Sequence, residues 1–189
     1  AELAFAIIRR FADDIPAADL QAIINKTYTR ATYGSDDITP LKKLEDGVAD
    51  ATLLAMAGLN RLGMGGVARG AIAPEEMLPA VAQGAIGVER RVSDARVAGM
   101  LDRIHDRETG LQLAAERAFL LRLDGSCQTP IAGLALVDGD ELWLRGEILR
   151  PDGSASVSGE RRGPVADGAA IGTALAEELL TRAGPGFFG

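Results

Sequence analysis

Two turns built on Asp-Gly sequences constrain the fold of this chain more than any other feature. They lie at residues 138–140 and 151–154 and separate three short segments, 131–137, 141–149 and 155–160, with the apolar content of strands. Asp and Gly adopt the tight backbone conformations that join antiparallel strands, so this pattern predicts a three-stranded antiparallel sheet. We expect its buried positions to include four leucines: Leu134, Leu136, Leu142 and Leu144.

Helical patterns flank this predicted sheet. Ser93 and Asp106 are residue types that cap helix N-termini, and an apolar helical pattern follows each of them. The segment from about Val165 to Ala183 has the spacing of a third helix with one apolar face. Because a sheet with an apolar face needs a cover, residues 90–189 are predicted to form an α+β unit, a three-stranded sheet covered by three helices.

The first part of the chain has a different composition. Of the 23 glycines, only Gly34 precedes residue 47, whereas all the lysines do. The apolar residues of Glu2–Ala12 are compatible with a mostly buried helix, and Pro16 fits the first turn of a second one. We therefore expect an N-terminal helical pair, followed by α/β segments with a strand near Ala85–Val88.

Composition excludes several classes of protein. The contents of hydrophobic (47%) and charged (25%) residues are those of a globular chain, and the net charge of -7 disfavours binding to nucleic acid or to an anionic membrane. A single Cys cannot form an internal disulfide, and one Cys with one His cannot build a zinc site, so we expect no metal. No segment has the pattern of a signal peptide or a membrane span, which favours the cytoplasm.

Cys127 is the residue of greatest chemical interest. It lies in Gly125–Pro130, between a predicted helix and a predicted strand, where an exposed thiol could act as a nucleophile. The competing interpretation is a small buried side chain, because unpaired Cys is often packed in cores. His105 and the pairs Arg90-Arg91 and Arg161-Arg162 are interpreted as solvated surface residues, although paired arginines could bind carboxylates.

Five collinear motifs carry a family resemblance. They are Ala51–Gly63, Leu78–Glu89, Ala115–Phe119, Asp124–Ile131 and Gly159–Gly163. Together they make residues 47–189 resemble porphobilinogen deaminase, also called hydroxymethylbilane synthase. That family is a transferase of tetrapyrrole and heme biosynthesis.

The resemblance implies a cofactor and a substrate. In the family, the Cys that matches Cys127 holds a dipyrromethane cofactor through a thioether, four porphobilinogen units are added to it with loss of ammonia, and a linear tetrapyrrole is then released. Arg61 matches an Arg that contacts acidic pyrrole side chains, and Gln83 matches a Gln that lines the same cleft. The resemblance also implies a monomer.

Residues 1–46 resemble a different family. The motifs Phe11–Pro16 and Tyr33–Leu41 are similar to the N-terminal segment of threonine synthase, a pyridoxal-phosphate enzyme, which suggests a chimera. The resulting domain scheme has a helical segment at 1–46, part of the deaminase substrate-binding domains at 47–89, and a cofactor-attachment domain at 90–189.

The resemblances leave three functions open. The first is a deaminase fragment with little or no turnover, because family residues such as a catalytic Asp match no position here. The second is a non-catalytic α+β module. The third is a fragment of a protein related to threonine synthase.

Overall fold

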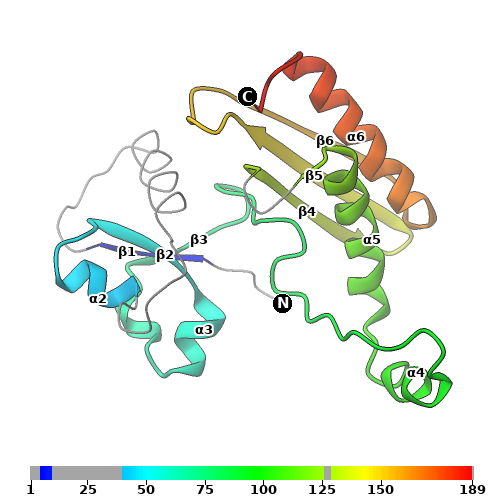
Figure 1. Ribbon diagram of the computed structural model, residues 1–189, viewed down its shortest axis with the longest axis horizontal. Coiled ribbons are helices and arrows are strands. Elements are labelled where there is room, and N and C mark those ends of the chain that lie inside the picture. The colour runs from blue at the N-terminus through cyan, green and yellow to red at the C-terminus, as the bar shows by residue number, and fades with distance from the viewer. Residues whose placement is uncertain (1–4, 10–39, 126–128, 189) are drawn as a thin grey trace. The chain divides into compact units, whose positions relative to one another are not determined.

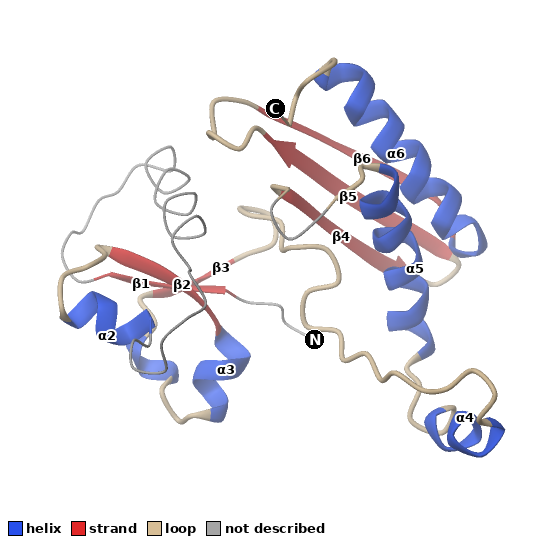
Figure 2. Ribbon diagram, viewed as in Figure 1, coloured by secondary structure: helices blue, strands red, loops and turns tan. Residues whose placement is uncertain are grey.

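The computed structural model describes residues 5–9, 40–125 and 129–188, the first of these ranges by its backbone only. The chain divides into two compact units, each described here by itself. The first unit comprises Ala1–Met77 with Pro151–Ser154, and the second comprises Leu78–Arg150 with Ala155–Gly189. Figure 2 shows that both contain helices and strands, so the predicted α+β class is confirmed.

A three-stranded antiparallel sheet forms the first unit. Its strand order is β2-β1-β3, with β1 at Phe5–Arg9, β2 at Ala51–Ala55 and β3 at Gly70–Ile72. Two short helices, α2 (Pro40–Glu45) and α3 (Met56–Arg61), contribute Leu44 and Leu59 to a small core.

The prediction of a helix over Glu2–Ala12 is wrong, because β1 occupies its centre. A short apolar run fits a buried strand as well as a helix, and strands on both sides supply hydrogen-bonding partners for β1. The second predicted helix, from Pro16, lies outside the described residues.

The second unit contains the predicted meander. Its strands are β4 (Ile131–Asp138), β5 (Glu141–Leu149) and β6 (Ser156–Pro164), paired antiparallel in that order. Both turns have the expected chemistry: Gly139 has a φ of 59°, Gly153 has a φ of 74°, and the Asp152 carboxylate accepts a hydrogen bond from the Ser154 amide. The prediction of the three-stranded antiparallel sheet is confirmed.

Two helices cover one face of this sheet. Figure 1 shows α5 (Arg107–Arg122) and α6 (Gly168–Ala183) side by side across the three strands. The core between helices and sheet is apolar, and its largest fully buried side chains are Phe119, Leu142, Leu144, Ile148, Leu175 and Leu179.

The expected cover of three helices is wrong in one respect. The helix α4 (Ala95–Leu101) has no buried residue and does not contribute to the core; its cap is Asp94 rather than Ser93. Asp106 caps α5 as predicted, because its carboxylate accepts a hydrogen bond from the Thr109 amide. The predicted strand at Ala85–Val88 is absent, since this segment is irregular.

The four leucines expected together lie on opposite faces of the sheet. Leu144 pairs with Ala135 and Leu142 with Val137, so the cross-strand register places Leu134 and Leu136 on the other face. Leu142 and Leu144 are fully buried, and Leu134 is 7% exposed, but Leu136 is 40% exposed. The burial of Leu136 was therefore predicted wrongly, because the turn between the strands places even-numbered residues of β4 opposite odd-numbered residues of β5.

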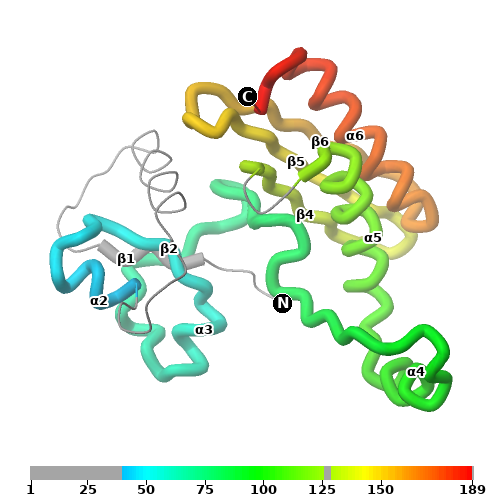
Figure 3. Tube along the Cα trace, in the orientation of Figure 1, coloured from blue at the N-terminus to red at the C-terminus, as the bar shows by residue number. Residues whose placement is uncertain are grey.

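A segment before α4 extends the edge of the sheet. Ala80 forms an isolated antiparallel bridge with Ala132 of β4, and the Gly133 amide donates a hydrogen bond to the Pro79 carbonyl at 3.0 Å. The Val81 side chain packs against the main core. Figure 3 shows the trace passing β4 on its way to α4, so residues 78–82 belong structurally to the second unit.

Candidate functional site

Arg61 occupies the last turn of α3 in the first unit. The helix follows β2 directly, and its final turn leaves the Arg61 side chain exposed to solvent. A guanidinium in this setting is available to a carboxylate ligand, because its five N–H donors form a planar fork.

Gln83 lies in a tight turn of the second unit. Its backbone amide donates a hydrogen bond to the Ala80 carbonyl at 3.1 Å, and its side chain is exposed. The neighbouring Ala82 has a φ of 60°, a left-handed conformation that residues other than Gly seldom adopt, and Gly84 has a φ of 83°. The turn therefore has a defined and unusual backbone shape.

Glu116, which is not among the site residues predicted from the sequence, holds this turn in place from α5. Its carboxylate accepts two backbone hydrogen bonds, from the Ala82 amide at 2.7 Å and from the Ala135 amide at 2.8 Å. The residue is only 6% exposed. Burial raises the pKa of the Glu116 carboxyl above its ordinary value of 4.5, and the two hydrogen bonds oppose part of that rise.

A sequence signal for Glu116 does exist. Ala115 and Phe119 of α5 and Leu123 at its C-terminal cap are buried at helical spacing, and Glu116 lies among these buried positions. An acidic residue among buried positions of a helix needs hydrogen-bonding partners, so its position alone indicates a structural or functional role.

The connection between α5 and β4 contains Cys127, which lies outside the described residues together with its two neighbours. Both ends of the connection are fixed. The Gly125 amide donates to the Leu120 carbonyl at the end of α5, and the Pro130 carbonyl accepts from the Leu149 amide of β5. A Cβ at Gly125 would overlap the end of the Leu120 side chain and lie 2.8 Å from the Ile131 Cδ1, so the ends of these two side chains would have to move to accept a larger residue where the connection begins.

The structure brings some of the predicted site residues into one unit. Gln83 belongs to the second unit, whose α5–β4 connection contains Cys127, and Glu116 bonds to the backbone next to Gln83 and to β4. Arg61 belongs to the first unit. Taken singly, a thiol can form a thioether and a guanidinium can bind carboxylates.

The other candidates have ordinary surface positions. The pair Arg161 and Arg162 forms ion pairs with Glu178 at 3.1 Å and Glu141 at 3.2 Å. His105 is exposed. Among the described residues, no group of His, Cys, Asp and Glu side chains could hold a metal ion.

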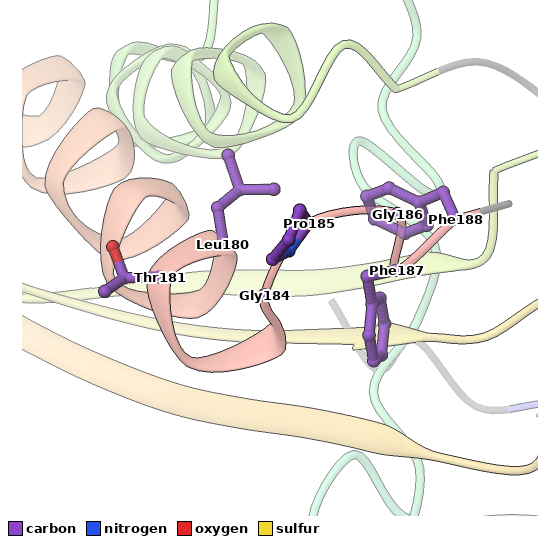
Figure 4. A pocket seen from close by; sticks show the side chains of 7 residues that line it. All are labelled: Leu180, Thr181, Gly184, Pro185, Gly186, Phe187 and Phe188. Atoms are coloured by element: carbon purple, nitrogen blue, oxygen red, sulfur yellow. The ribbon is translucent and has the colours of Figure 1, made fainter.

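A hollow near the C-terminus does not resemble a site for an acidic ligand. Figure 4 shows the Phe187 and Phe188 rings beside the end of α6, with Thr181 as the polar side chain among the lining residues. No charged side chain lines this hollow, so it offers no counter-ion to a carboxylate.

Comparison with protein families identifies two domains. Residues 17–99 match the "porphobilinogen deaminase, dipyrromethane cofactor binding domain", and residues 111–181 match the "porphobilinogen deaminase, C-terminal domain". The match to residues 17–99 does not support the predicted chimera, because it includes most of the segment assigned to a threonine synthase resemblance. That assignment rested on two motifs that are too short to identify a family.

Curated relatives agree with the domain matches. The chain is 71% identical over 150 residues to porphobilinogen deaminase of Paracoccus denitrificans and 51% identical over 150 residues to that of Nitrobacter hamburgensis. Each alignment covers 79% of this chain and 48% of the relative, so the chain spans about half the length of these proteins. The two matched domains together cover most of the chain, which therefore belongs to the porphobilinogen deaminase family.

Proposed function

We propose that this chain carries the cofactor anchor of a porphobilinogen deaminase, with Cys127 as the point of covalent attachment. One structural observation supports the proposal most strongly. The two elements that flank Cys127, α5 and β4, are held to each other by the Glu116 hydrogen bond to Ala135 and by the buried Phe119. A short connection between two fixed elements is a suitable place for a side chain that must hold a growing chain of pyrroles.

The attachment step is a substitution at the aminomethyl carbon of porphobilinogen. The Cys127 sulfur forms a bond to that carbon as the carbon–nitrogen bond breaks. The bonding electron pair leaves with nitrogen, which also takes up the thiol proton, so one molecule of ammonia is released for each thioether formed. A second porphobilinogen joined to the first pyrrole, again with release of ammonia, gives the dipyrromethane.

Binding of acidic pyrroles would depend on Arg61 and Gln83. Porphobilinogen carries two carboxylates, and the chain itself has a net charge of -7, so the ligand needs local cationic and hydrogen-bonding groups. Arg61 can pair with a carboxylate through the planar fork of N–H donors on its guanidinium. The side-chain amide of Gln83 can donate a hydrogen bond to a carboxylate.

The residues named in the proposal fall within two different matched domains. The range matched to the cofactor binding domain, 17–99, contains Arg61 and Gln83, whereas Cys127 lies within the range matched to the C-terminal domain. We assign the covalent bond to the C-terminal domain and the non-covalent contacts to the other.

Location and substrate belong to the same proposal. The described part of the chain contains no helix that could cross a membrane. We propose a cytoplasmic location, which cell fractionation would test, and porphobilinogen as the small-molecule ligand.

The intact mass of the purified protein under denaturing conditions tests the proposal. After incubation with porphobilinogen, the wild type should gain mass in steps of one pyrrole unit less ammonia, and Cys127→Ala should gain none. Arg61→Ala should gain mass at a higher half-saturating porphobilinogen concentration than the matched control Arg103→Ala. An unchanged wild-type mass would favour a non-catalytic α+β module instead.

A further inference from the structure

The strand β4 lies at an edge of the sheet in the second unit. The strand order is β4-β5-β6, so β5 pairs with one side of β4 only. The other side of an edge strand presents backbone N–H and C=O groups, to which a strand of another chain can bind. Residues 131–137 of β4 carry no charge and include no Pro. An edge strand of this composition favours pairing with another chain.

The other edge strand, β6, is protected by its own side chains. It carries the exposed residues Glu160, Arg161 and Arg162 and ends at Pro164. Charged residues and Pro on an edge oppose the approach of a further strand. Because residues 131–137 of β4 include neither, the edge of β4 needs a cover from another part of the unit.

Residues 78–82 cover the first part of this edge. The Pro79 carbonyl accepts a hydrogen bond from the Gly133 amide at 3.0 Å, and Ala80 forms an isolated antiparallel bridge with Ala132. The Val81 side chain packs against the core and so holds the segment at the sheet. The bridge involves a single residue of β4, so the cover does not continue along β4 by strand pairing.

Glu116 of α5 covers the next position on the same edge. Residues of an antiparallel strand point their amides alternately toward the paired strand and away from it, so the amides of Gly133 and Ala135 lie on the same side of β4. The Glu116 Oε1 accepts a hydrogen bond from the Ala135 amide at 2.8 Å, and its Oε2 accepts from the Ala82 amide at 2.7 Å. One carboxylate therefore occupies the edge of β4 and fixes the end of the covering segment.

The burial of Glu116 supports this interpretation. Within residues 40–125 and 129–188, it is the one charged residue among the buried side chains. Burial of a carboxylate is costly, and an apolar side chain of similar size would avoid that cost. An apolar side chain would, however, leave the amides of Ala82 and Ala135 without the acceptor that they now have. The carboxylate thus serves the edge of the sheet, which the packing of α5 alone does not require.

We propose that Glu116 and residues 78–82, together called the edge cover, keep β4 from pairing with the β4 of a second copy of this chain. Without the edge cover, the two strands would pair antiparallel about a two-fold axis at Leu134, with Gly133 of each copy opposite Ala135 of the other. This register sets Asp138 opposite Pro130, so no like charges meet and the two uncharged runs lie side by side. The inference is independent of the proposed cofactor.

Sedimentation velocity over a range of protein concentrations tests the proposal. Glu116→Leu keeps a good helix former at this position but offers no acceptor. It should form a particle of twice the monomer mass, with half association at a concentration roughly 10-fold lower than in the wild type, because pairing gives the released amides new acceptors. Circular dichroism shows whether the variant is folded. A folded Glu116→Leu that associates like the wild type would overturn the proposal.

Gly146→Ala is the matched control for a loss of stability. It disturbs the packing of Phe119 in the same unit and leaves the edge cover unchanged. It should therefore associate like the wild type. If it associates as readily as Glu116→Leu, loss of stability alone causes association and the proposal is wrong.

Hydrogen exchange locates the contact between the two copies. As the concentration of Glu116→Leu rises, the peptide that contains residues 131–137 should exchange more slowly, and the peptide that contains residues 157–163 of β6 should not change. Leu136→Lys in the same background adds a charge to the edge strand and should restore the association of the wild type. Protection that leaves out β4, or association that Leu136→Lys does not weaken, would contradict pairing through β4.

Glu116→Gln decides the question if Glu116→Leu does not fold. Gln keeps the size of the side chain and one acceptor, and its NH₂ group then faces either the Ala135 or the Ala82 amide. Either β4 itself or the covering segment loses its bond, so we expect the half-association concentration to fall roughly 3-fold. A half-association concentration equal to that of the wild type would overturn the proposal.

Discussion

The ring of Phe119 lies directly against the backbone of Gly146. A methyl group at Gly146 would lie 2.5 Å from the Cζ of this ring, and the ring also reaches within 3.5 Å of the Cβ position of Gly133, the residue that pairs with Gly146 across β4 and β5. Gly146 thus makes room for the ring from α5, whereas a Cβ at Gly133 would be in ordinary van der Waals contact with it. This contact anchors the helix to the sheet in the turn that follows Glu116.

Replacement of Gly146 by Ala should destabilise the second unit. The fully buried Phe119 ring would have to move in a close-packed core, and overpacking of this kind costs about 1–3 kcal/mol in the free energy of unfolding. Urea unfolding followed by the fluorescence of Trp143, the single Trp of the chain, would measure the change. Gly99→Ala, in the exposed α4 with open space around it, is the control and should not destabilise. Equal stabilities of the two variants would contradict this account of the contact.

Replacement of Gly172 by Ala should destabilise the second unit more than Gly146→Ala does. A methyl group there would overlap the Ala115 carbonyl oxygen and lie 2.9 Å from the Phe119 backbone nitrogen, so α5 and α6 could not keep their present separation. Backbone atoms yield less readily than a side chain, and we expect a loss of at least about 3 kcal/mol. The same unfolding measurement applies, and a smaller effect than that of Gly146→Ala would show that the helices can separate easily.

Glu116 should make the stability of the fold fall as the pH rises. Its native pKa is raised above the ordinary value of 4.5, so between these two pKa values the native state binds more protons than the unfolded state. The free energy of unfolding therefore decreases with increasing pH over that window and becomes constant, for this group, once the native carboxyl is ionised.

The comparison with Glu116→Gln isolates this contribution. The free energy of unfolding of the wild type minus that of the variant should decrease as the pH rises from about 4.5. Urea unfolding of both proteins at several pH values between 4 and 8 would measure it. A difference that increases with pH would mean that the two backbone hydrogen bonds outweigh burial.

Trp143 should report on the outer face of the sheet. The guanidinium groups of Arg145 and Arg162 lie 4.6 and 4.2 Å from the centre of its ring, and its Nε1 donates to Glu160. Arg162→Ala should change the Trp143 emission but cost only about 0.5–1 kcal/mol, because the stacked cation is exposed and its ion pair with Glu141 is weak in water. A decrease of several kcal/mol in the free energy of unfolding would contradict the interpretation of this face as a solvated surface.

The sequence predicts elements whose signals are local. The Asp-Gly turns, the cap at Asp106 and the apolar spacing of α6 each depend on neighbouring residues, and all three are present in the structure. The strand β1 could not be predicted in the same way, because its conformation depends on two partners distant in the sequence, β2 and β3.

In the candidate site too, contacts between residues distant in the sequence could not be predicted. Cys127, Arg61 and Gln83 came from family motifs, whereas Glu116 owes its role to amides 34 and 19 residues away. Periodicity does not show such distant partners. The position of Leu136 was likewise predicted wrongly, because the face of a strand depends on how the turn aligns it with its neighbour.

The most direct measurement of the central claim is the location of the adduct by peptide mapping. Protein incubated with porphobilinogen is digested, and the peptides are sequenced by tandem mass spectrometry, with Cys127→Ala treated in parallel. The account predicts pyrrole units on the peptide that contains Cys127 and on no other, and an unmodified variant. Adducts on other residues, or equal modification of Cys127→Ala, would contradict the assignment of Cys127 as the anchor.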